Sequence, residues 1–393
     1  MGLSIPRRNR QVDTVFGNGL RRHTHGGRIL EGKELLMDLQ PDFERFRTAV
    51  NHQEADRVPL CEALVGYGIM SKFLDREVIP EDIVSQVEFW AKAGYDYIPM
   101  PVSLMVPGKV TEESKITRIL RQMVLEKNPQ ETNPDAWNLE LSSFIHERED
   151  FERFPWEAAA DIEFGKLDAL EFLLPDKMKA IVITGKIFTL TWMLMGFQNF
   201  SLKLVLEPDL VGDVFRKVAE IQFSALDRIL SKDYVGAVWA VDDLAFGSGP
   251  MISPEAYREH VFPWYREMAQ RCHAKDRIYI MHSDGDLTKL MPDLIDVGID
   301  VLQPIDPSCM DIAKTKQEFG DRICLVGNVP NELLRSGTPE EVQAYTKNLL
   351  RNCAAGGGYC VGSGNSVPDW ANFDNFMAMR DTTLEYGAYP ISL

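Results

Sequence analysis

Short apolar runs alternate with longer helix-patterned segments along most of the chain. From about residue 57 onward, each run is nearly continuous in Val, Ile, Leu, Tyr and Met, which is typical of strands buried on both faces of a parallel sheet. Eight runs follow this pattern: RVPLCEAL (57–64), YDYIPMP (95–101), KAIVITG (179–185), GAVWAVDD (236–243), RIYIMHSDG (277–285), VLQPIDP (301–307), ICLVGNV (323–329) and GYCVGSGN (358–365).

The segments between the runs carry helix start and stop signals. Ser253 before Pro254, and Thr338 before Pro339, each place an N-cap residue ahead of a proline in the first turn. The segments LTKLMPDLIDVG and DIAKTKQEFG both end at a glycine, as expected just after a helix. The pattern therefore predicts helices between the strands.

Eight strand–helix units predict a (β/α)₈ TIM-type barrel. The alternative is an open doubly wound sheet, but no G-x-G-x-x-G follows the first run. A long insertion separates the second and third strands, and we expect a hairpin and helices there that cover the barrel mouth. The predicted domains are an N-terminal tail or docking arm over residues 1–40 and a barrel domain over 41–393.

Composition and charge narrow the class of protein. Hydrophobic residues make up 45% of the 393 residues and charged residues 26%, values that suit a soluble globular protein. The formal net charge of -17 repels phosphate backbones, so we expect no nucleic-acid partner. Six cysteines without a CxxC pair predict a reduced, cytoplasmic protein. No apolar stretch reaches the length of a membrane span.

Polar side chains gather at the carboxyl ends of the apolar runs. The active site of a (β/α)₈ barrel is built at that end, so we expect these side chains to surround one opening. Structural explanations remain open for several of them, since an aspartate pair can cap a helix, a histidine can be a core residue and Asp-Gly is ordinary turn chemistry. The candidates are Glu62, Asp242, Asp243, His282, Asp284, Gln303, Asn328 and Asn365.

From residue 43 onward the chain resembles the uroporphyrinogen decarboxylase superfamily, and in particular its branch of corrinoid-dependent methyltransferases. The segments that carry the resemblance are EADRVPL, GPMISPEAYREHVFPWYREM, MHSDGDLTKLMPDLIDVGIDVLQPIDP, EFGDRICLVGNV and GGGYCVGSGNSVPDWANFDNFMAM. The resemblance implies a (β/α)₈ barrel, methyl transfer to or from a cobamide, a corrinoid protein as partner, and a homodimer.

Two departures from the family pattern bear on the chemistry. The arginine-rich segment that grips tetrapyrrole propionates in the decarboxylases here reads EALVGYGIMSKF, which argues against porphyrinogen decarboxylation. In the zinc-dependent methyltransferases the fifth strand ends in His-x-Cys and a later loop adds a second cysteine, but these cysteine positions fall on Asp284 and Gly364. We expect a metal-free site first, and the alternative is a harder divalent metal bound by His282 with Asp284, Glu62 or Asp243.

The first functional hypothesis is a corrinoid-linked methyltransferase for a small methylated substrate. His282 and Asp284 would donate a proton or hold a Lewis acid, Asp242 and Asp243 would orient them, and the aromatic residues Tyr67, Trp192 and Phe246 would line the pocket. The second hypothesis is a carboxy-lyase acting on a smaller acid, for which Lys186 is the one lysine at a strand end. The third is a non-catalytic ligand-binding barrel.

Overall fold

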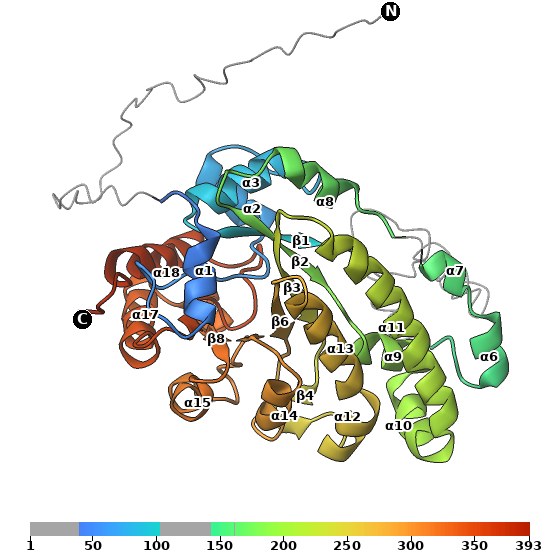
Figure 1. Ribbon diagram of the computed structural model, residues 1–393. Helices are drawn as coiled ribbons and strands as arrows, with labels where there is room; N and C mark the ends of the chain where they lie inside the picture. The colour runs from blue at the N-terminus through green and yellow to red at the C-terminus, as the bar shows by residue number, and fades with distance from the viewer. Residues whose placement is uncertain (1–38, 103–142, 161) are drawn as a thin grey trace, which may run out of the picture. The chain divides into compact units, whose positions relative to one another are not determined.

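Seven of the eight apolar runs form one parallel sheet in the computed structural model, which describes residues 39–102, 143–160 and 162–393 (Figure 1). The order of the strands in the sheet follows the order of the sequence, as it does in a barrel. The strands in this order are β1 (Tyr97–Pro101), β2 (Lys179–Thr184), β3 (Val235–Val241), β6 (Ile278–His282), β7 (Val301–Gln303), β8 (Cys324–Val326) and β9 (Tyr359–Cys360).

The first apolar run, 57–64, differs from the prediction, because in the described residues it forms two isolated bridges, at Arg57 and Leu60, rather than a strand. Leu60 pairs in parallel with Val361. Pro59 has no N–H to donate to a ladder. On the β1 side, the Glu62 N–H donates to the Tyr97 hydroxyl at 2.8 Å. The sheet is therefore a curled, seven-stranded parallel sheet, and a complete eight-stranded barrel is not formed by backbone ladders in this part of the chain.

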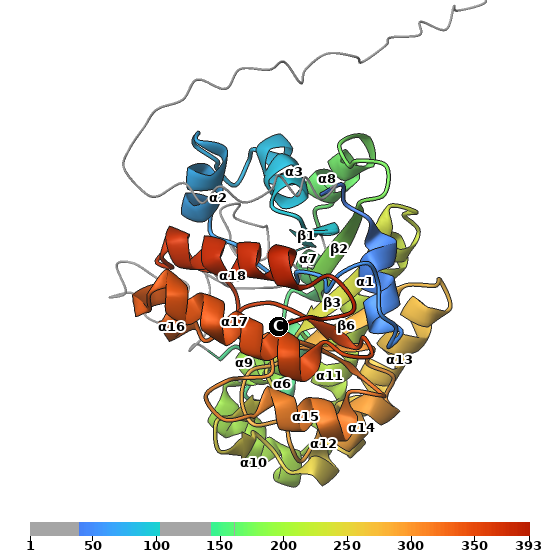
Figure 2. The same ribbon diagram turned by 90° about the vertical axis from the view of Figure 1, so that its left-hand side faces the viewer.

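Helices follow the strands, as the α/β pattern predicted. Within the described residues they are α1 (Phe43–Val50), α2 (Tyr67–Leu74), α3 (Ile83–Lys92), α6 (Arg148–Arg153), α7 (Trp156–Ala159), α8 (Gly165–Ala169), a 3-10 helix (Leu170–Phe172), α9 (Phe188–Met195), α10 (Phe197–Leu206), α11 (Pro208–Leu230), α12 (Pro254–His260), α13 (Phe262–His273), α14 (Met291–Asp296), α15 (Ile312–Phe319), α16 (Asn331–Ser336), α17 (Pro339–Cys353) and α18 (Phe373–Tyr386). The last two long helices, α17 and α18, lie side by side (Figure 2).

Both predicted N-caps are confirmed. The Ser253 hydroxyl accepts the Ala256 N–H, and the Thr338 hydroxyl accepts the Glu341 N–H in a capping box. The segment that opens at Ser253 forms two helices, α12 and α13, instead of one. Pro263 lies in the first turn of α13, and its missing N–H and its ring end the preceding helix.

The sheet interior is closed at the amino ends of the strands by α1. Phe43 and Phe46 of this helix pack in one buried cluster with inward side chains of the strands, among them Tyr97, Ile181 and Trp239. A side chain at position 236 would collide with the Phe43 ring, because a Cβ there would lie 2.4 Å from it, so glycine is required. The opposite end, where the strands finish, is left for polar groups.

The predicted N-terminal tail lies almost wholly outside the described residues, and so do the predicted helix and hairpin in the first part of the insertion, 103–142. The remainder of the insertion contains α6 and α7. Residues 39–393 form one compact unit. Within the described residues, no helix combines the length and the apolar character needed to cross a bilayer.

Candidate active site at the carboxyl end of the sheet

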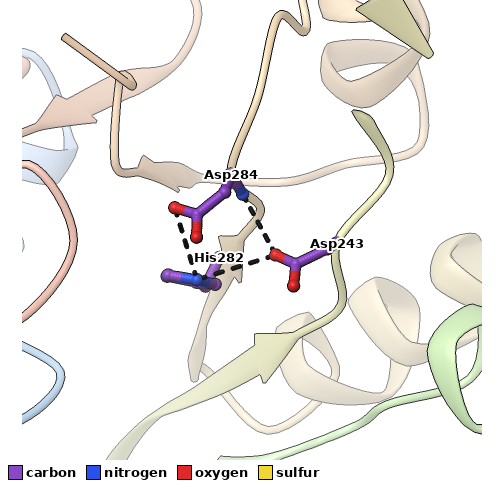
Figure 3. Close-up of side chains that lie close together, drawn as sticks. All are labelled: Asp243, His282 and Asp284. Atoms are coloured by element: carbon purple, nitrogen blue, oxygen red, sulfur yellow. Dashed lines mark hydrogen bonds and ion pairs between the residues drawn. The ribbon is translucent and has the colours of Figure 1, made fainter. Parts of the chain in front are cut away.

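Three predicted side chains meet just beyond the ends of β3 and β6. The two strands pair in parallel with Val241 opposite His282, so Asp243 and Asp284 both follow the paired ends closely. The ligand atoms of Asp243, His282 and Asp284 all lie within 4.8 Å of one another (Figure 3). His282 Nε2 is 3.8 Å from Asp243 Oδ1 and 3.8 Å from Asp284 Oδ1. Parallel strand ends thus bring together residues that are distant in sequence.

Asp284 is held at one carboxylate oxygen and left open at the other. Its Oδ2 accepts a hydrogen bond from Asn365 Nδ2 at 2.7 Å, and its N–H donates to Asp243 Oδ1 at 3.1 Å. Its buried Oδ1 has no hydrogen-bond partner among the described residues. Burial raises the pKa of Asp284, and the Asp243 and Asp306 carboxylates raise it further, whereas His282 and the Asn365 hydrogen bond act in the opposite direction.

Gly285 allows the loop after β6 to approach the β4–β5 hairpin (Ala245–Phe246 and Gly249–Pro250). Its φ is +90°, and a Cβ there would lie 2.4 Å from the Ala245 carbonyl oxygen. The Gly285 N–H donates to Asp306 Oδ2 at 3.1 Å. The Asp-Gly pair is therefore turn chemistry, as one alternative held, but it also fixes the backbone that carries Asp284.

The three-residue group has the donor set of a divalent cation site. It offers two carboxylates and one imidazole, with an unpartnered buried oxygen among them. In the described residues, the ion-pair partner of both carboxylates is His282. A cation would relieve the repulsion that raises the pKa of Asp284, and oxygen-rich sites favour harder metals than thiolate-rich ones. The residues present therefore fit a metal ion.

Asp242 is not part of this group, although it adjoins Asp243. It is fully buried, and its carboxylate accepts the backbone N–H groups of Ile187, Phe188 and Thr189 at 2.6–2.7 Å. The Tyr265 hydroxyl donates to the same carboxylate at 2.7 Å. Burial raises the pKa of Asp242, and these hydrogen bonds oppose that shift. The carboxylate thus anchors the start of α9, and a catalytic role for Asp242 remains a prediction.

Glu62 also lies apart from the group. Its carboxylate accepts the Ser363 N–H at 2.5 Å and the Ser363 hydroxyl at 2.8 Å. The side chain is fully buried, and burial raises its pKa to about 8. As a metal ligand Glu62 remains a prediction. Its observed contacts with Ser363 tie the first apolar run to the loop after β9, and they oppose the rise in pKa that burial causes.

The predicted substrate-binding amides have partners within the protein. Gln303 Oε1 lies 2.6 Å from His282 Nδ1, and Asn365 contacts Asp284. Asn328 donates through Nδ2 to the Ile305 carbonyl at 2.7 Å, while its buried Oδ1 has no partner in the described part of the chain. Gln303 and Asn365 therefore support His282 and Asp284, and direct contact of any of the three amides with substrate remains a prediction.

Two of the three predicted aromatic residues belong to one row of rings. The Trp192 and Phe197 rings lie 5.7 Å apart, and the Phe197 and Phe246 rings 6.2 Å apart. Phe246 is 52% exposed and follows Asp243 by three residues in the chain. Phe197 was not predicted from the sequence, because its place at the junction of α9 and α10 depends on tertiary packing. Tyr67 begins α2 and is half-buried, and its place in the pocket remains a prediction.

Comparisons with known proteins agree with this architecture. The uroporphyrinogen decarboxylase (URO-D) family model matches residues 145–386, which is more than half of the chain. A methylated-thiol–coenzyme M methyltransferase of Methanosarcina mazei is 24% identical over 64% of this chain and 63% of its own length. A uroporphyrinogen decarboxylase of Chlorobium luteolum is 29% identical over 34% of this chain and 39% of its own length. The chain thus matches less than two thirds of the length of either relative.

A solved structure of a methyltransferase from Methanosarcina mazei covers 87% of this chain and 98% of its own, with a TM-score of 0.59 and 16% sequence identity. This likeness supports the fold. Together with the match over residues 145–386, it places the strand ends described above within a known α/β architecture. The chain belongs to the uroporphyrinogen decarboxylase (URO-D) family.

Proposed function

We propose that the protein is a corrinoid-linked methyltransferase, which moves a methyl group between a small methylated substrate, such as an O-methyl compound, and a cobamide. The observation that carries the proposal is the group formed by Asp243, His282 and Asp284 at the carboxyl end of the sheet. Relatives that are named methyltransferases support the type of reaction. The cobamide, its delivery by a corrinoid protein and a homodimeric assembly are part of the proposal because the sequence resembles the corrinoid-dependent methyltransferases.

The chemistry requires the site to stabilise a negative charge. When a methyl group leaves an ether, the bonding electron pair stays on the oxygen, which then needs a proton or a Lewis acid. Asp243, His282 and Asp284 would hold a divalent cation, which supplies Lewis acidity when bound. Without a metal, the proton would come from Asp284 or from a His282 ring that carries a hydrogen on both nitrogens. The ring row of Trp192, Phe197 and Phe246 offers an apolar wall for the substrate.

The first experiment is a metal analysis of the purified protein, followed by titration of the metal-free form with Mn²⁺, Co²⁺ and Zn²⁺. We expect one equivalent of metal per chain, lost in His282→Ala. The matched control is His273→Ala, since His273 also faces a carboxylate, Asp300 at 2.9 Å, but lies outside the three-residue group. Absence of binding by the unmodified protein would remove the metal from the proposal.

The second experiment measures methyl transfer directly. The protein is mixed with reduced cobalamin and a panel of O-methyl, S-methyl and N-methyl compounds, and formation of methylcobalamin is followed in the visible spectrum. We expect one class of donor to give turnover that falls at least 100-fold in Asp284→Ala and is unchanged in His273→Ala. Failure of every donor class with both free cobalamin and corrinoid proteins would count against methyl transfer.

A carboxy-lyase is the second candidate, because relatives named uroporphyrinogen decarboxylase also match the chain. Such an enzyme needs a cation to hold the substrate carboxylate. Asp243 and Asp284 bring no lysine or arginine to the site, since their ion-pair partner in the described residues is His282, so these residues favour the first candidate. Release of carbon dioxide from small carboxylic acids, without methyl transfer, would reverse this order.

A further inference from the structure

Gln303 connects the His282 ring to the loop after β9. The side chain is fully buried, and it ends β7 directly beside His282, with which it pairs in register across the β6–β7 ladder. Its Oε1 lies 2.6 Å from His282 Nδ1. Its Nε2 donates to the Asn365 carbonyl oxygen. The amide therefore has a hydrogen-bond partner on each side. One partner, a carbonyl oxygen, can only accept a hydrogen bond, whereas the other, an imidazole nitrogen, can donate or accept.

The identity of these partners fixes the direction of the hydrogen bonds. The Asn365 carbonyl can only accept, so the Gln303 NH₂ group must face it. The Gln303 oxygen must then face the imidazole, and an amide oxygen can only accept. His282 Nδ1 consequently has to carry a hydrogen. In the neutral ring, Nε2 is then the nitrogen with the free lone pair.

The opposite edge of the ring agrees with this assignment. Nε2 lies 3.8 Å from Asp243 Oδ1 and 3.8 Å from Asp284 Oδ1, beyond the usual range for an N–H donor and a carboxylate. Two carboxylates would ordinarily draw the ring hydrogen to Nε2, because each is a stronger acceptor than an amide oxygen. Gln303 opposes that pull from the other side of the ring.

We infer that Gln303 is a positioning residue, which together with the Asn365 carbonyl holds His282 in the Nδ1–H tautomer and aims the Nε2 lone pair at the gap between Asp243 and Asp284. The use of that lone pair to bind a metal rests on the proposed function, whereas the tautomer itself does not. Asn365 serves both sides of the group, since its side chain also holds Asp284 Oδ2 at 2.7 Å.

The first test reads the tautomer without any metal. The full-length, metal-free protein is labelled with ¹⁵N-histidine, and the ring nitrogens are observed by NMR at alkaline pH, where imidazoles are neutral. Loss of one set of signals in His282→Gln identifies His282. We expect Nδ1 protonated and Nε2 unprotonated in the unmodified protein, and a hydrogen on Nε2 in Gln303→Leu. Gln303→Glu keeps an acceptor for Nδ1 but loses the donor to the Asn365 carbonyl, and we expect Nδ1 to stay protonated there.

The matched control is Gln222→Leu. Gln222 is also a buried glutamine, which accepts the Gly185 N–H through Oε1 and donates to the Lys186 carbonyl through Nε2, but neither partner is a ligand of the group. We expect this variant to leave the His282 signals unchanged. An Nε2–H tautomer in the unmodified protein, or an unchanged tautomer in folded Gln303→Leu, would overturn the inference. Should Gln303→Leu not fold, the unmodified protein and Gln303→Glu still decide it.

The second test separates this inference from the proposed function. Calorimetric titration with Co²⁺ should show 10- to 100-fold weaker binding in Gln303→Leu, the usual effect of removing a partner that orients a metal-ligating histidine, and unchanged binding in Gln222→Leu. Equal binding by Gln303→Leu and the unmodified protein would contradict the positioning role. If the unmodified protein binds no metal, the proposed metal site fails, and the NMR measurement alone decides the tautomer.

Discussion

The two ends of the sheet interior each hold a carboxylate with one buried oxygen that lacks a hydrogen-bond partner among the described residues. These oxygens are Asp96 Oδ2 near the amino ends and Asp284 Oδ1 at the carboxyl ends. Their countercharges differ. Asp96 is fully buried between Arg45, with which it forms a salt bridge, and Arg57, whose Nη2 lies 3.9 Å away. Asp284 faces the His282 ring and has two other carboxylates nearby. An unpartnered oxygen alone therefore does not identify a functional site, whereas a missing countercharge is informative.

The largest effect is expected at the amino end. Asp96→Asn removes the carboxylate that pairs with the buried Arg57 guanidinium and leaves Arg45 with Asp56 alone. Removing one partner of a buried ion pair typically costs about 3–5 kcal/mol. We expect a loss of about 3 kcal/mol in the free energy of unfolding, measured by chemical denaturation. Metal affinity of the folded fraction should stay the same, since the arginine cluster lies at the other end of the strands.

Asp56→Asn is the control for that substitution. Asp56 also pairs with Arg45, at 2.6 Å, but its side chain is 60% exposed. Exposed pairs contribute about 0–1 kcal/mol. Equal losses in Asp56→Asn and Asp96→Asn would mean that burial of the pair is not what stabilises the amino end.

A second prediction concerns Glu62, a carboxyl on the mouth side whose hydrogen-bond partner is Ser363. Its pKa is raised from 4.5 to about 8 by burial. The folded protein therefore keeps a proton that the unfolded chain releases, and the resulting stability is complete below pH 4.5 and lost as pH rises through about 8. At roughly 1.4 kcal/mol per pKa unit, the unfolding free energy should fall by about 2 kcal/mol between pH 6 and pH 8.

Glu62→Gln should remove this pH dependence, because an amide does not titrate. Denaturant unfolding of both proteins at pH 6 and pH 8 provides the measurement. The difference in unfolding free energy, Glu62→Gln minus unmodified protein, should be larger at pH 8 than at pH 6. Parallel losses of stability in the two proteins would show that Glu62 titrates as an ordinary exposed carboxyl.

The strand ends could be predicted from the sequence, but the direction of their side chains could not. An apolar run that turns polar at His282 reports where a strand reaches the mouth, and parallel pairing then brings Asp243 and Asp284 to it. Asp242 and Asp243 look equivalent in sequence, yet successive side chains point to opposite sides of the chain. Which of the two carboxylates contacts the start of α9 depends on where that helix packs. The sequence pattern does not contain this information about tertiary structure.

The same limit explains the first apolar run. Its composition is that of a strand, and Leu60 does pair with Val361, but the proline before Leu60 and the use of the Tyr97 hydroxyl as the partner of Glu62 interrupt the ladder. A hydrophobic pattern records burial, and residues 57–62 of the run are buried. It does not record whether each backbone N–H meets a carbonyl or a side chain.

The smallest expected effect makes the sharpest comparison. Asp284→Asn is the same chemical substitution as Asp96→Asn, but we expect the opposite sign for the change in unfolding free energy. It removes a charge that has two carboxylate neighbours and no arginine among its ion-pair partners in the described residues, so the metal-free protein should gain stability. The side chain is 37% exposed, and solvent screening limits the gain to about 0.5 kcal/mol. Paired denaturation curves at pH 7 without metal would measure this gain.

Co²⁺ binding should weaken in the same variant, as expected when a carboxylate binds a ligand at a cost to the stability of the fold. A loss of stability in metal-free Asp284→Asn would instead place Asp284 with Asp96, as a structural carboxylate.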